Sequence, residues 1–119
     1  MSKGEKPFII KRNDTAPALI ATVFDQGCLG GWNRFSLSSV TSINFSMIDD
    51  CGSLIISSQS AQTISASSGI IQYSWRNGDT SMAGNFIGEF ELFFADGTKM
   101  SLPREGGINI RIAEDINNI

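Results

Sequence analysis

Histidine is absent from all 119 residues of the chain. Imidazole is the usual general base near neutral pH and a common zinc ligand. Its absence excludes Ser-His and Cys-His nucleophile pairs and histidine-containing zinc sites. Carboxylates or an activated lysine are the only remaining routes to acid–base chemistry. We therefore predict that the protein is not an enzyme and has no catalytic residues.

Cysteine is also scarce, since Cys28 and Cys51 are the only two. One pair does not give the repeated spacing of a metal site, and a reducing cytoplasm disfavours a disulfide. We expect two free thiols, packed as small apolar groups or left in turns. The prediction is accordingly no metal site and no cofactor.

Positive charge is sparse as well, because 9 basic residues stand against 12 acidic ones, for a net charge of -3. The basic residues are scattered along the sequence, whereas a protein that grips a phosphate backbone needs them clustered. We expect no nucleic-acid partner and no attraction to anionic lipid.

Long apolar runs are missing too. Residues 1–6 are polar, and only residues 8–10 form an apolar run before Lys11 and Arg12. A signal peptide needs about 7–15 apolar residues, and a membrane span about 20. The sequence thus predicts a soluble protein made in a cytoplasm, with no membrane partner. It also predicts a flexible N-terminal arm at residues 1–6.

What the sequence does have is alternation of apolar and polar residues, which is typical of β-strands with one wet face. It predicts strands within residues 8–12, 18–24, 41–47, 54–56, 71–75, 86–94, 99–102 and 108–112. Residues 18–24 are apolar on both faces, as in a strand packed on two sides. Eight or nine short strands with turn signals about every 8–12 residues predict a single β-sandwich domain.

The segments between these strands carry their own signals. Asn77-Gly78 and Asp96-Gly97 are hairpin-type turn signals, because these residue types tolerate positive φ. Residues 57–69 are rich in Ser, Ala and Gln, and we interpret them as a thin edge strand and loop. Gly30-Gly31-Trp32-Asn33 indicates an open loop.

Glu89 and Glu91 are the first candidates for chemistry. They stand two apart on one strand and so lie about 6–7 Å apart on one face, close to the carboxylate separation used in glycoside hydrolysis. A flat strand offers no cleft that raises one pKa. We therefore interpret them as the solvent face of a strand whose other face is Phe90 and Leu92.

Two aspartates and the two tryptophans are the other residues that we interpret individually. Asp49 and Asp50 lack EF-hand spacing, so Asx-type turn hydrogen bonding explains them better than a calcium site. Trp75 is in register with Tyr73 and is expected in the core. Trp32, in a glycine-rich loop, is either an exposed contact residue or packed within its loop.

Several segments with fixed offsets together resemble one known family. The matching segments are residues 9–17, 69–75, 79–80, 84–92, 96–97, 102–103 and 108–112. They are similar to the N-terminal domain of phage baseplate upper proteins, with Asn13 where that family usually has glycine. The resemblance covers residues 7–116. It implies an all-β, immunoglobulin-like antiparallel β-sandwich of about 8 strands.

The resemblance also implies a function. The expected protein is a bacteriophage virion structural protein of the tail or baseplate. It would act as an adaptor through protein–protein contacts and be assembled in the host bacterial cytoplasm. Its partners would be other phage structural proteins, and virion symmetry favours a homo-oligomer, a trimer or ring. A capsid decoration (cement) protein and a carbohydrate-binding adsorption module remain as alternatives.

The contacts are expected from three segments of the surface. They are the N-terminal arm with Lys3 and Lys6, the loop that contains Gly30, Gly31 and Trp32, and the polar edge at residues 57–68.

Overall fold

The computed structural model describes residues 6–26, 32–103 and 106–116, and most of these residues are in strands. Ten strands form within them: β1 (Phe8–Lys11), β2 (Leu19–Thr22), β3 (Phe24–Gln26), β4 (Trp32–Arg34), β5 (Val40–Asp49), β6 (Leu54–Ser65), β7 (Ile70–Tyr73), β8 (Gly84–Phe94), β9 (Lys99–Leu102) and β10 (Ile108–Ala113). No helix in this part of the chain is long and apolar enough to cross a membrane.

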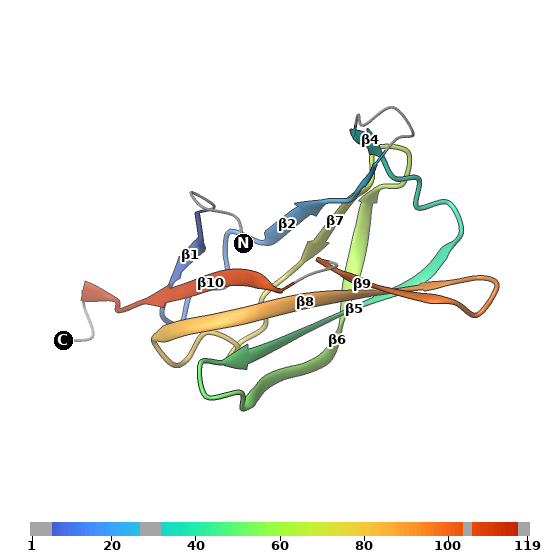
Figure 1. The fold of residues 1–119 in the computed structure, drawn as a ribbon. Helices are drawn as coiled ribbons and strands as arrows, with labels where there is room; N and C mark the ends of the chain where they lie inside the picture. The colour runs from blue at the N-terminus through green and yellow to red at the C-terminus, as the bar shows by residue number, and fades with distance from the viewer. Residues whose placement is uncertain (1–5, 27–31, 104–105, 117–119) are drawn as a thin grey trace.

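Eight of these strands form one sheet in the order β1-β10-β8-β5-β6-β7-β2, with β9 paired to β8. The sheet folds over at β6, whose first half pairs with β5 and whose second half pairs with β7. Figure 1 shows β6 rising from the level of β5 and β8 to that of β7 and β2. We call β1, β10, β8, β9, β5 and the first half of β6 the main layer. The second half of β6 with β7 and β2 is the second layer.

The two layers enclose one aromatic and aliphatic core. Phe45 of β5 stacks on Tyr73 of β7 with ring centroids 4.5 Å apart, and it contacts Phe90 of β8 at 5.0 Å. Trp75, only 5% exposed, packs edge-on against both Phe45 and Tyr73. Ring contacts between the layers therefore hold the sheet in its folded-over form. The predicted all-β sandwich is confirmed.

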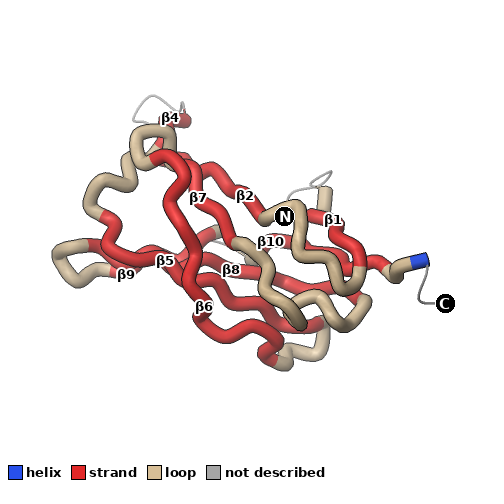
Figure 2. Tube along the Cα trace, turned by 180° about the vertical axis from the view of Figure 1, so that it is seen from behind, coloured by secondary structure: helices blue, strands red, loops and turns tan. Residues whose placement is uncertain are grey.

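Pairing within the sheet is antiparallel, with one difference from the predicted pattern. The exception is β1, which pairs with β10 in parallel, so that Phe8 lies beside Ile110 and Ile10 beside Ile112. Figure 2 shows the same arrangement from behind, with strands along most of the trace and loops mainly at their ends.

The prediction of an edge strand and loop at residues 57–69 is wrong. The strand β6 continues from Leu54 to Ser65 and lies between β5 and β7, and the ends of the sheet are β1 and β2. Its polarity has another cause, because most of its side chains are exposed although β6 is paired on both sides. Ser57 and Ser58 lie at an irregularity in the pairing with β5, and Ser58 has a positive φ of 47°.

Two local expectations also need correction. The strand at residues 18–24 is not packed on both faces, because no described residue covers its outer face, where Ile20 is 60% exposed. Asn77-Gly78 does form a turn, with φ of 92° at Gly78. It does not close a hairpin, however, because β7 and β8 lie in different layers and do not pair.

Candidate functional site

An apolar row crosses the outer face of the main layer, the face turned away from the second layer. The register places Leu54, Ile48 and Ile87 side by side on β6, β5 and β8, and Asn109 of β10 follows Ile87. Leu54 is 59% and Ile87 42% exposed. Adjacent exposed apolar side chains on neighbouring strands point to a contact surface rather than to a simple solvated face.

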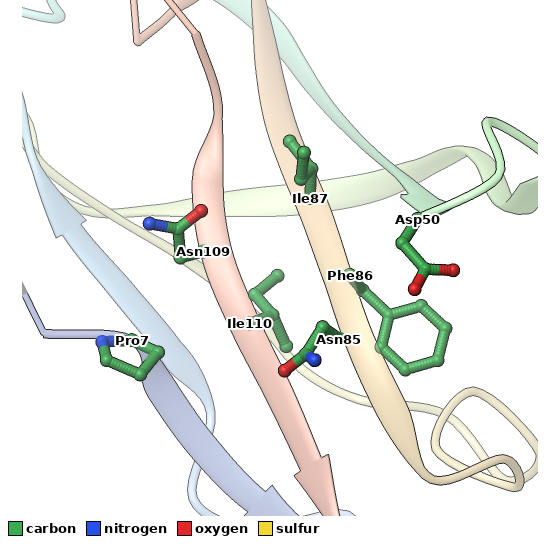
Figure 3. A pocket seen from close by; sticks show the side chains of 7 residues that line it. All are labelled: Pro7, Asp50, Asn85, Phe86, Ile87, Asn109 and Ile110. Carbon is green, nitrogen blue, oxygen red and sulfur yellow. The ribbon is translucent and has the colours of Figure 1, made fainter. Parts of the chain in front are cut away.

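Two shallow hollows lie along this row and meet at Ile87. The first, which we call the Asp50 hollow, measures about 340 Å³ and is lined by Pro7, Asp50, Asn85, Phe86, Ile87, Asn109 and Ile110. Figure 3 shows Pro7 and Asp50 at its two ends, with Asn109 and Asn85 between them. The second, the Gly107 hollow, measures about 270 Å³ and is lined by Ser46, Met47, Ile48, Leu54, Ile87, Gly88, Glu89, Gly106 and Gly107.

The polar side chains of the Asp50 hollow are free to bind. Asp50, Asn85 and Asn109 are all exposed, and none forms a side-chain hydrogen bond to another described residue. They present one carboxylate and two carboxamides around an apolar floor, and none of the described residues that line the hollow is basic. Such a lining favours a ligand that has a positive charge next to an apolar group.

Gly107 sets the position of Ile87. A Cβ atom at residue 107 would lie 2.1 Å from Cγ2 of Ile87, so only glycine leaves room for that side chain across the start of β10. Ile87 therefore lies between the two hollows and contributes to both.

A second row, parallel to the apolar one, carries charges of both signs. On β1, β10 and β8 the register aligns Ile9, Arg111 and Asn85, and Asp50 shares its hollow with Asn85. Arg111 and Asp50 are exposed, and neither forms an ion pair within the described residues. By contrast, Arg12, Arg76 and Lys99 pair with Glu114, Asp79 and Glu91.

The turn between β5 and β6 brings Asp49, Asp50 and Cys51 together, with possible ligand atoms within 4.8 Å of one another. Asp49 Oδ1 accepts hydrogen bonds from the backbone N–H groups of Cys51 at 3.0 Å and Ser53 at 2.8 Å. The interpretation of these aspartates as turn residues is thus confirmed for Asp49. Cys51 is a free, exposed thiol, and Cys28 lies outside the described residues.

A second polar cluster lies at the buried end of β7. Tyr73 donates its phenolic hydrogen bond to Asp79 at 2.5 Å, and the same carboxylate accepts from the backbone N–H of Arg76 at 2.8 Å. Arg76 also pairs with Asp79 through Nη2 at 2.9 Å. Burial, followed by the bond to the Asp79 carboxylate, raises the pKa of Tyr73 to about 12. The cluster fixes the connection between the layers and faces none of the hollows.

The predicted contact residues that the structure describes, Trp32 and Lys6, are not among the residues that line the two hollows. Trp32 begins β4 and pairs with Gln26 of β3, so its backbone is in a strand and not in the expected open loop. Lys6 is exposed ahead of β1, whereas Lys3, Gly30 and Gly31 lie outside the described residues. Their roles as contacts stay predictions. Trp75 is buried, as expected.

Glu89 and Glu91 lie on the outer face, as predicted, and Glu91 pairs with Lys99 at 3.3 Å. Ile87, Asn109 and Arg111 were not predicted as a group from the sequence. One signal was available: Ile87 is an outward apolar residue between the outward Asn85 and Glu89 of the same strand.

The architecture defines a nearly closed, immunoglobulin-like β-sandwich. By sequence, the chain matches no protein family and no curated protein. Among solved structures it is similar to CopC from Methylosinus trichosporium OB3b, with a TM-score of 0.50 and 10% sequence identity. That match covers 92% of this chain and 86% of CopC. Identity this low supports a shared fold and nothing finer.

This finding overturns the resemblance to phage baseplate upper proteins, because the fold matched is that of CopC. The assignment as a bacteriophage tail or baseplate structural protein is therefore wrong, together with its capsid and adsorption alternatives. The physical reason is that the segments behind it, such as residues 84–92 and Asp96-Gly97, are strand and turn patterns common to many sandwiches. The place in a virion and the partners drawn from it stay untested predictions.

Proposed function

We propose that this chain is a non-catalytic binding domain whose Asp50 hollow takes a ligand with a positive charge beside an apolar group. One observation carries the proposal. Asp50, Asn85 and Asn109 surround Ile87 on an open sheet face, and their polar groups have no side-chain partner among the described residues. The chain's lack of histidine supports binding without catalysis, because among the described residues neither hollow has a nucleophile paired with a base.

Copper is the ion to test against these side chains, since CopC is a copper-resistance protein. Imidazole suits copper, and thiolate or thioether groups suit Cu(I). The chain has no histidine, Met47 is fully buried in the core, and Met82 is exposed. The turn at Asp49, Asp50 and Cys51 offers one thiol and two carboxylates, of which Asp49 Oδ1 already accepts two backbone hydrogen bonds. Carboxylates suit harder cations than copper. These residues do not fit a copper site, and no role for copper follows.

The proposed function is tested by nuclear magnetic resonance titration with phenethylammonium as the probe and phenethyl alcohol as its neutral counterpart. We expect the cation to shift the resonances of Asn85, Ile87 and Asn109 at lower concentration than the alcohol does. Asp50→Asn should weaken cation binding by at least about tenfold, as the loss of a charge-assisted hydrogen bond does.

Asp14→Asn is the matched control, because Asp14 is exposed in the turn after β1 and lies outside the hollow. The proposal is wrong if both probes shift the same residues equally, or if Asp50→Asn binds the cation as the unaltered chain does. A Cu(II) titration of the same sample adds an independent check. Tight, stoichiometric copper binding would contradict the conclusion that these residues do not fit a copper site.

A further inference from the structure

We propose that a second copy of this chain docks on the outer face of the main layer, with Arg111 of each copy against Asp50 of the other. The inference rests on the proposed function, because the second copy then supplies the positive and apolar groups that the Asp50 hollow takes. It adds the identity of the ligand and the symmetry of the complex.

The apolar side chains of this face have a self-complementary arrangement. Ile9 on β1 is 57% exposed and lies at one end of the face, Leu54 on β6 is 59% exposed at the other, and Ile87 on β8 is between them. A two-fold axis that runs parallel to β8, above its outer face, brings Ile87 of one copy against Ile87 of the other. It also places the β1 end of each copy on the β6 end of the other, so that Ile9 lies diagonally from Leu54, one row away along the strands.

The charges agree with the same axis. Arg111 lies on β10, to one side of β8, whereas Asp50 follows β5 on the other side. Rotation about β8 exchanges the two sides, so each Arg111 faces the Asp50 of the other copy, and the contact occurs twice. Both side chains lack an ion-pair partner within the described residues, so each is available for the other copy. Sheets that pack face to face with aligned strands are a common arrangement.

Glu89 distinguishes this arrangement from the other possible rotation. Glu89 lies on β8 beside the axis, on the outer face, without an ion pair in the described residues. The proposed axis brings the two copies' Glu89 side chains together, so their repulsion opposes association. An axis that crosses the strands along the apolar row would place Glu89 near Arg111 instead, and Glu89 would then favour association.

Sedimentation equilibrium of the full chain over a range of concentrations tests the proposal. We expect a monomer–dimer equilibrium, and Arg111→Asp or Ile87→Lys should raise its Kd by at least about tenfold. Arg111→Asp combined with Asp50→Arg should restore association, because the swap recreates the pair. Glu89→Gln should lower the Kd. Ile20→Lys is the control, since Ile20 is also an exposed isoleucine, at 60%, and lies on the second layer.

Three results would overturn the proposal: a chain that is monomeric at every concentration, a charge swap that does not restore association, or Glu89→Gln raising the Kd. Circular dichroism of each variant checks that its fold is intact. Phenethylammonium titration of the Arg111→Asp variant tests the hollow without a second copy on it, whereas sedimentation of the unaltered chain tests self-association. If the variant binds the probe and the unaltered chain is monomeric at every concentration, self-association is wrong and the binding site stands. If the unaltered chain is monomeric and the variant does not bind the probe either, both proposals fail.

Discussion

At the scale of single residues, Tyr73 reports on the buried polar cluster of the fold. It is the only tyrosine in the chain, it is 1% exposed, and its hydroxyl donates to Asp79. Both burial and the neighbouring carboxylate disfavour the ionised phenolate, which explains the rise of its pKa from 10.0 to about 12. The hydroxyl is thus held in its donating form across the whole neutral range.

This pKa predicts how stability depends on pH at the alkaline end. The raised folded-state value means that Tyr73 contributes stability that is fully present below pH 10 and is lost as the pH rises toward 12. The free energy of unfolding should therefore fall between these two values. Tyrosinate absorbance follows Tyr73 alone, and ionisation near pH 10 in the folded protein would contradict the buried hydrogen bond to Asp79.

At the scale of elements, the close packing of β8 against its neighbours depends on a glycine in the middle of the strand. Gly88 is buried in the middle of this strand, on the face turned toward the core. An added Cβ would lie 2.7 Å from Cζ of Phe45 and 2.8 Å from Cδ1 of Ile110. The missing side chain is what lets the Phe45 ring lie between β8 and the second layer.

We therefore expect Gly88→Ala to lower the free energy of unfolding by about 1–3 kcal/mol, the usual effect of overpacking a core. Chemical denaturation measures it. Ile110→Val removes one of the atoms that the new methyl group meets, so the double variant should lose less than the sum of the two single changes. Strict additivity would show that Ile110 is not the obstructing neighbour.

At the scale of the whole molecule, β6 joins the two layers into one structure. Its residues pair with β5 in the main layer and with β7 in the second layer, and rings from both layers meet at Phe45. The two layers therefore share one core. The fold should accordingly behave as one cooperative unit.

We predict a β-type far-ultraviolet spectrum and one unfolding transition, with circular dichroism and intrinsic fluorescence changing at the same denaturant concentration. Because the core is continuous, Trp75→Ala should shift both signals together. Two separated transitions would mean that the layers unfold independently and that β6 does not couple them.

The sequence by itself determined the strands and their inward faces. Period-two alternation was sufficient to place Phe45, Phe90 and Tyr73 in the core, because it depends only on neighbours along the chain. The predicted turn at Asp96-Gly97 was correct for the same local reason: Gly97 has a φ of 90°, and β8 pairs with β9 across it.

The tertiary structure alone decided which strands are neighbours. The polar composition of β6 indicated an edge, yet the strand lies inside the sheet, between β5 and β7, with most of its side chains exposed to solvent. The row that joins Arg111, Asn85 and Asp50 comes from strands far apart in sequence. Register between such strands is set by the packing of the whole core, so no local pattern contains it.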